Sequence, residues 1–85
     1  MATPGIRPLV AGNWKMNGSL AMAGTLVDAL KARQGNVDLL VCPPFPYLAA
    51  VGAALKGSKL ALGAQDCHAN ASGAHTGDVA APMLA

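Results

Sequence analysis

The chain lacks several features that would direct it to a membrane, to the secretory pathway or to nucleic acid. No apolar run approaches the roughly 18 residues of a membrane span, and the N-terminus has no continuous apolar segment like that of a secretory signal. We therefore expect a cytoplasmic protein without a membrane partner. Charged residues make up only 12% of the chain, and its net charge of +2 comes from scattered lysines and arginines. This balance argues against a nucleic-acid partner.

Cysteine is also scarce, and its spacing predicts neither a redox motif nor a metal site. Cys42 and Cys67 form no CxxC pair and no disulfide framework, so free, buried thiols are expected. Cys67, His68 and His75 match no common structural zinc pattern and supply only three ligands. No metal site is predicted on this ground. The glycines also lack the spacing of either phosphate-binding loop motif.

The chain is rich in apolar residues, and they alternate between two kinds of segment. With 85 residues, 53% of them hydrophobic, it is long enough for one small domain. The pattern predicts, in order, a strand over 8–15, a helix over 19–34, a strand over 37–42, a helix from Pro46 to about Gly57, a strand over 59–65, a loop over 66–77 and a helix from Val79. Such alternation indicates an α/β protein with a parallel sheet and right-handed crossovers.

The first predicted helix has clear sequence signals at both ends. Ser19 is a good N-cap, and the pair Gly35-Asn36 is expected to end the helix as a glycine turn. Its core-facing stripe recurs at helical spacing and consists of Leu20, Ala23, Val27 and Leu30. The second helix has a similar stripe at Leu48, Val51 and Leu55.

The polar residues of greatest interest follow the first predicted strand. Asn13 and Lys15 should point the same way, about 7 Å apart, because side chains alternate along a strand. Trp14 should point to the other face and pack behind the sheet. An amide beside an ammonium would suit an anion or a carbonyl group, and parallel α/β proteins bind ligands at this end of their strands. A solvated lysine beside a turn asparagine is the alternative, and spacing does not decide between them.

Residues 12–17, Gly-Asn-Trp-Lys-Met-Asn, resemble the opening signature of triosephosphate isomerase. The resemblance continues in family order through residues 42–45, 63–65 and 72–78. It covers nearly all of this chain but only the first third of a complete enzyme. It implies an α/β fold made of the first three βα units of a (β/α)8 TIM barrel, with residues 1–85 as the N-terminal fragment of a single barrel domain.

The resemblance also implies a function. The family interconverts dihydroxyacetone phosphate and D-glyceraldehyde 3-phosphate through an enediolate in glycolysis and gluconeogenesis, without cofactor or metal. Lys15 carries over as a catalytic residue, and Asn13, Lys15 and Trp14 as substrate-binding residues. The family's glutamate base and histidine electrophile do not carry over, because the chain contains no glutamate and both of its histidines precede the fourth strand. The 85 residues alone are therefore expected to be inactive.

In the family, the loop corresponding to 66–77 inserts into the partner subunit of a dimer. The resemblance thus implies a homodimer of the full-length protein, with His75, Thr76 and Gly77 at the interface. Departures from the family pattern at Asp66, His75, Asp78 and Ala80 leave the local loop geometry open. The alternative is a non-catalytic βαβ binding or dimer-docking module.

Two structural expectations follow from the same resemblance. Lys15 should have a positive φ, a conformation in which strain accompanies function. The loop over 66–77, which is long for a compact α/β pattern, should project from the sheet and leave Thr76 exposed.

Overall fold

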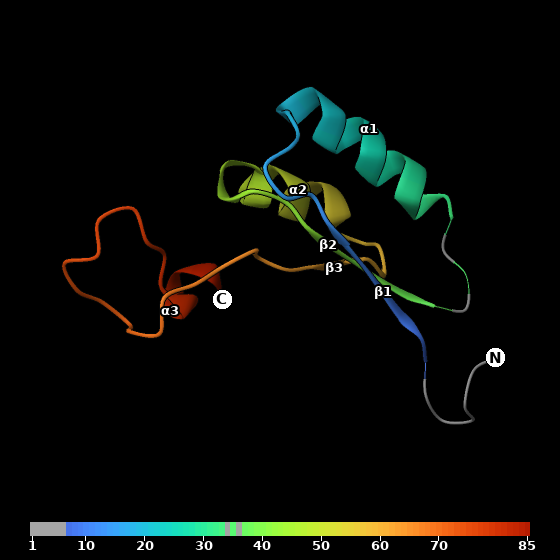
Figure 1. Ribbon diagram of the computed structural model, residues 1–85. Helices are drawn as coiled ribbons and strands as arrows, with labels where there is room; N and C mark the ends of the chain where they lie inside the picture. Colours follow the sequence, from blue (N-terminus) through green and yellow to red (C-terminus); the bar gives the residue numbers. More distant parts are fainter. Residues whose placement is uncertain (1–6, 34, 36) are drawn as a thin grey trace.

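A three-stranded parallel sheet forms the centre of the molecule in the computed structural model, which describes residues 7–33, 35 and 37–85 (Figure 1). Its strands are β1 (Leu9–Asn13), β2 (Asp38–Cys42) and β3 (Ala61–Leu62), in the order β1-β2-β3. β1 pairs with β2 from Leu9 opposite Asp38 to Asn13 opposite Cys42. The predicted α/β class and parallel sheet are confirmed.

The helices that connect the strands lie together on one face of the sheet (Figure 1). Helix α1 (Leu20–Lys31) joins β1 to β2, and helix α2 (Leu48–Leu55) joins β2 to β3. Strands that follow one another in sequence order, with their helices on a single face, are typical of a sheet that curls into a barrel. In a doubly wound sheet, by contrast, the strand order reverses and helices cover both faces.

Helix α1 begins where the sequence predicts and ends earlier. The hydroxyl of Ser19 accepts a hydrogen bond from the Met22 N–H at 3.0 Å, which makes Ser19 the predicted N-cap. The helix ends at Lys31 with Ala32 as its C-cap, rather than at residue 34. The predicted glycine turn at 35–36 cannot be compared, because residues 34 and 36 lie outside the described residues.

Both helices bury their apolar stripes against the sheet and each other. Val27 of α1 and Val51 of α2 are almost fully buried, at 0% and 1% exposed. The core cluster consists of Trp14, Ala23, Val27, Val41, Val51, Leu55 and Leu60. Leu20 was predicted to belong to this stripe and does not, because it is 64% exposed. Helical spacing places Leu20 on the correct side of α1, but burial also needs a neighbouring element at the helix's first residue.

Helix α2 is preceded by a 3-10 turn that spans Phe45–Tyr47. Pro46 therefore lies in this turn, and the α-helix itself begins two residues later than predicted. Gly57 has a φ of 79° just beyond the helix, which fits the predicted end there. The ammonium of Lys31 donates to the carbonyl oxygen of Ala54 at 2.8 Å and so joins α1 to the last turn of α2.

The outer two strands are shorter than predicted. β1 ends at Asn13 instead of residue 15, because the positive φ at Lys15 interrupts the extended chain. β3 contains only Ala61 and Leu62 instead of residues 59–65. The chain runs so close to β2 at the end of β3 that a Cβ on Gly63 would lie 2.9 Å from the Sγ of Cys42.

Extended pairing continues past Val79, where a helix was predicted to begin. Ala80 forms a parallel bridge with His68, and helix α3 spans only Ala81–Leu84. Within the described part of the chain, no helix is long and apolar enough to cross a membrane. The sheet face opposite the helices is not covered by other described residues. Every residue of β1 is exposed, and Leu9 keeps 63% of its surface accessible.

Candidate functional site

The ends of the three strands bring Asn13, Lys15 and Gln65 to one edge of the sheet. The backbone N–H of Trp14 donates to the carbonyl oxygen of Cys42 at 3.1 Å, which continues the β1–β2 pairing past Asn13. The side-chain amide of Gln65, three residues after β3, donates to the same Cys42 carbonyl at 2.8 Å. The site therefore lies at the carboxyl edge of a parallel sheet, as the sequence predicted.

Lys15 has a φ of 54°, so the predicted positive φ is confirmed. This left-handed conformation disfavours a residue with a Cβ by about 1–2 kcal/mol. Two hydrogen bonds hold the residue in place from opposite sides. Its N–H donates to Asn13 Oδ1 at 2.8 Å, and its carbonyl oxygen accepts from Gln65 Nε2 at 2.9 Å. Asn13 and Gln65 together therefore fix the backbone that aims the lysine side chain.

Gln65 contacts the candidate site, and the sequence did not assign it there. It lies in residues 63–65, which resemble the family pattern, but nothing in its spacing indicated a contact with Lys15, 50 positions away. Its Nε2 group bridges the carbonyl oxygens of Lys15 and Cys42 and so ties the end of β1 to the end of β2. The available signal was its place at the end of the third predicted strand, at the edge where Asn13 and Lys15 were already expected.

Trp14 supports the site from behind. It is only 8% exposed and belongs to the hydrophobic core, as expected for a side chain on the opposite face from Asn13. Its carbonyl oxygen accepts from the Asn17 side chain at 3.0 Å, and its ring lies 3.4 Å from where a Cβ on Gly18 would stand. So little of the indole is accessible that the predicted contact between Trp14 and substrate finds no support in this geometry.

Asn13 and Lys15 present complementary polar groups to solvent at this edge. Both residues are exposed. Since Asn13 Oδ1 accepts the Lys15 N–H, its NH2 group is the part that it can offer to a ligand. Among the described residues, the ion pair found is Arg7 with Asp38, at the other end of the strands, and no carboxylate pairs with Lys15. An ammonium and an amide donor side by side can bind a phosphate or stabilise an oxyanion.

A second feature is the arm, which we define as residues 66–77. It leaves the sheet after β3 and projects away from it (Figure 1). His68 closes its base, where its N–H donates to the carbonyl oxygen of Val79 at 2.7 Å. Thr76, Gly77 and His75 are all exposed. The predicted projection of the arm and exposure of Thr76 are confirmed.

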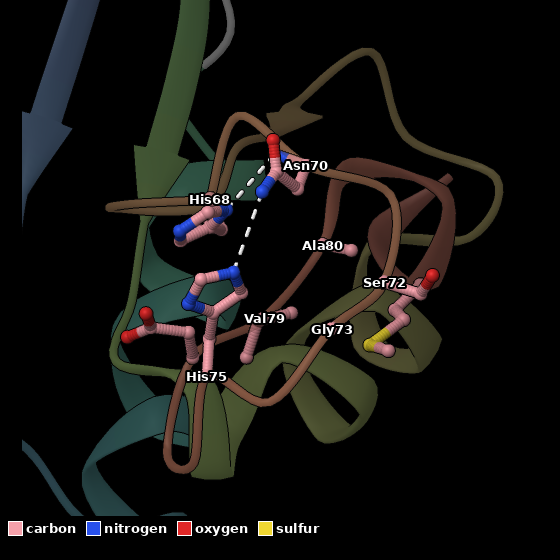
Figure 2. A pocket seen from close by; sticks show the side chains of 9 residues that line it. His68, Asn70, Ser72, Gly73, His75, Val79 and Ala80 are labelled. Carbon is pink, nitrogen blue, oxygen red and sulfur yellow. Dashed lines mark hydrogen bonds between the residues drawn. The ribbon is translucent and has the colours of Figure 1, made fainter.

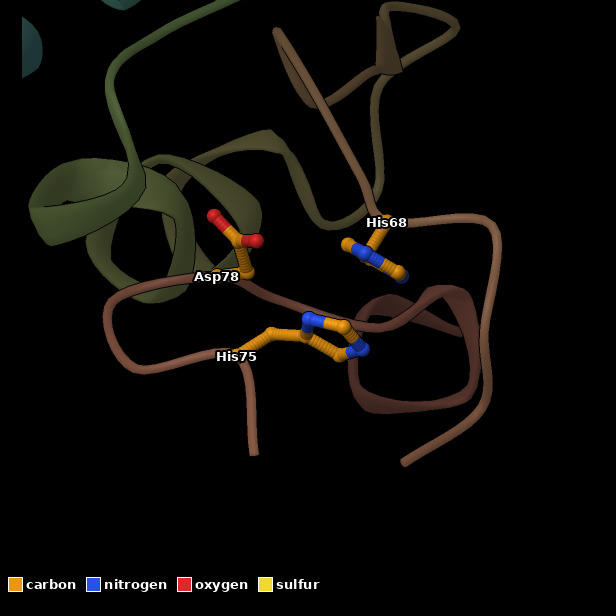
Figure 3. A group of neighbouring side chains, drawn as sticks. All are labelled: His68, His75 and Asp78. Carbon is orange, nitrogen blue, oxygen red and sulfur yellow. The ribbon is translucent and has the colours of Figure 1, made fainter. Parts of the chain in front are cut away.

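The arm brings His68 and His75 into contact. Their rings stack with centroids 3.9 Å apart and an interplanar angle of 24° (Figure 2). Asp78 is the third member of the group, and one ligand atom from each residue lies within 4.8 Å of the other two (Figure 3). Cys67, which was considered beside these histidines as a ligand, does not belong to the group. The expectation of buried thiols is wrong, because Cys67 is exposed and Cys42 is only partly buried, although both are free.

Comparison with known proteins gives one consistent result. A family model described as Triosephosphate isomerase matches residues 8–85. Triosephosphate isomerases of Bradyrhizobium diazoefficiens and Afipia carboxidovorans are each 56% identical to the chain, over 98% and 94% of its length. That of Bordetella pertussis is 54% identical over 91% of the chain. The matched regions make up 34%, 33% and 32% of these relatives, so the chain spans about a third of their length.

Proposed function

Because the chain belongs to the triosephosphate isomerase family, we propose that it supplies the N-terminal third of an enzyme that interconverts dihydroxyacetone phosphate and D-glyceraldehyde 3-phosphate. The reaction passes through an enediolate and takes part in glycolysis and gluconeogenesis. Cytoplasmic residence and a homodimer formed through the arm belong to the same proposal. The observation that carries it is the fixed backbone of Lys15 at the carboxyl edge of the sheet, supported from both sides by Asn13 and Gln65.

In this proposal the chain provides the substrate-binding corner of the active site. The Lys15 ammonium attracts the dianionic triose phosphate and stabilises the negative charge that develops on the enediolate. The NH2 group of Asn13 donates to the same ligand. The proton transfer itself needs a carboxylate base and a polarising group, and a longer protein would supply both from later strands. Preorganisation explains the two backbone hydrogen bonds at Lys15, since donors already in position need no rearrangement during the reaction.

The test uses a chimera in which residues 1–85 replace the matching third of the Bradyrhizobium diazoefficiens enzyme. A coupled assay should detect isomerisation by the chimera. Lys15→Ala should lower its kcat/KM by roughly 100- to 1,000-fold, the usual loss for one group that stabilises an oxyanion. Lys59→Ala is the matched control, because this lysine is also exposed but precedes β3 at the opposite end of the strand. Its activity should be unchanged.

The alternative is a non-catalytic βαβ binding or dimer-docking module. In that case the chimera would fold, as judged by circular dichroism, but would show no turnover above buffer. Equal activity of the Lys15→Ala and Lys59→Ala chimeras would also exclude the proposed role of Lys15.

A further inference from the structure

The cluster formed by His68, His75 and Asp78 takes no part in the proposed isomerase site, and we propose that it binds a divalent transition-metal ion such as Zn²⁺. The three residues come from a short stretch of the arm and its exit, and His75 and Asp78 are exposed. An exposed site matters here, because an ion entering it keeps part of its hydration and meets only a small desolvation penalty.

The side chains already stand close to coordination geometry. Their ligand atoms lie within 4.8 Å of one another, whereas ligands about 2.0–2.1 Å from a tetrahedral ion are roughly 3.4 Å apart. A closure of up to about 1.4 Å is therefore needed, and rotation of the three side chains can provide it. The closure also opens the stack of the two imidazole rings, which is a change that spectroscopy can follow.

Asn70 contacts both imidazole rings and shows which nitrogen of each ring is free. Its backbone N–H donates to His68 Nδ1 at 2.9 Å, and its side-chain amide lies 3.3 Å from His75 Nε2. Figure 2 shows both contacts on the same side of the rings, so the second nitrogen of each ring faces away from Asn70. Figure 3 shows the Asp78 carboxylate beside those rings. Metal-binding histidines instead donate their other ring N–H to an acceptor, so the hydrogen bond from the Asn70 N–H to His68 Nδ1 has to break when an ion binds.

The ligand set determines the kind of ion. Two imidazole nitrogens and one carboxylate suit Zn²⁺, Ni²⁺ or Cu²⁺, with water completing the coordination. Mg²⁺ and Ca²⁺ prefer oxygen ligands and should bind poorly. Since a backbone N–H can only donate, His68 Nδ1 is the unprotonated nitrogen in this structure. An ion on Nε2 therefore shifts the ring proton to Nδ1 and ends the contact with the Asn70 N–H.

The test is a calorimetric titration of the 85-residue chain with Zn²⁺, followed in parallel by NMR of the histidine rings. One ion per chain should bind, and the Asn70 amide resonance and both imidazole signals should move together. His75→Phe keeps an aromatic ring against His68 while removing its nitrogens, and should weaken binding by more than about tenfold.

Cys67→Ser is the matched control, because the exposed thiol of Cys67 is the nearest alternative ligand in sequence. Its affinity for Zn²⁺ should equal that of the parent chain, and Mg²⁺ should give no heat of binding. Absence of Zn²⁺ binding by the parent would overturn the proposal. So would equal affinity of His75→Phe and the parent, or loss of binding in Cys67→Ser. None of these outcomes depends on isomerase activity.

Discussion

Lys15 keeps a strained backbone because its neighbours satisfy both of its backbone polar groups. Asn13 accepts from its N–H and Gln65 donates to its carbonyl oxygen, so any relaxation of φ would break at least one of these bonds. Strain held in this way is common where a side chain must be aimed. The sequence indicated the two polar residues at the strand end, but the positive φ came from the family resemblance. The bond from Gln65 could not be predicted, because it depends on how three strand ends meet.

The strain at Lys15 can be measured by comparing two variants that both remove the ammonium. In the chimera, Lys15→Gly should have a higher free energy of unfolding than Lys15→Ala, by about 1 kcal/mol. Glycine adopts a φ of 54° without a steric penalty, whereas alanine retains the Cβ clash. Urea denaturation at one fixed protein concentration gives the difference. Equal stability of the two variants would show that the backbone at this residue is not strained.

Gln65 is expected to act as a positioning residue. Gln65→Glu replaces the donor Nε2 by a carboxylate oxygen, which can only accept and would face the carbonyl oxygens of Lys15 and Cys42. In the chimera we expect kcat to fall, together with a loss of stability of about 1–3 kcal/mol from two lost hydrogen bonds and the new repulsion. Steady-state kinetics and urea denaturation measure the two effects.

Gln65→Ala separates these contributions. It removes the donor without adding charge, and water can reach the exposed carbonyl groups, so its stability should lie between those of the parent and Gln65→Glu. A Gln65→Glu chimera with parental kcat would show that Gln65 does not position Lys15.

At the scale of the elements, the sequence predicts a boundary well where a local side-chain signal marks it. Ser19 is a local signal with a local partner, so the start of α1 follows from the sequence. The length of β3 depends instead on its pairing with β2, which includes only Ala61 and Leu62. The same limit applies to Leu20, whose burial depends on a neighbour that helical spacing does not specify. Features that depend on neighbours within a few residues can be predicted from the sequence. Features that depend on packing between elements can be known only from the folded structure.

The arm is the element most open to a direct test of assembly. Thr76 in the arm is exposed, as a contact with a second copy requires. In the chimera, Thr76→Arg should lower the mass measured by light scattering towards that of a monomer, because a long charged side chain would have to be buried against the second copy. Ala29→Arg, on the exposed side of α1, should leave the mass unchanged. An unaltered mass for Thr76→Arg would remove the arm from the proposed interface.

At the scale of the whole molecule, helices cover one face of the sheet, and the other face is exposed to solvent. The helices bury Val41 and its neighbours on one side, while Leu9 and Val10 of β1 remain 63% and 54% exposed. Apolar side chains left in water and unpaired strand edges favour association with other chains. In a complete barrel the interior layers of side chains would cover such a face. The isolated chain therefore presents the proposed substrate-binding residues on a sheet with one uncovered apolar face.

We predict that the 85 residues alone do not catalyse the isomerisation. The chain contains no glutamate, and proton abstraction by a placed base typically contributes about 100- to 10,000-fold to such a rate. It also lacks the later βα loops that often bind phosphate in this fold, so Lys15 would attract a triose phosphate only weakly in water. A coupled assay on the purified chain should show no turnover above buffer. Adding the complementary two thirds of a relative should restore activity, and Lys15→Ala should abolish that gain. Turnover by the chain alone that disappears in Lys15→Ala would contradict this prediction, because it would require a base among these residues.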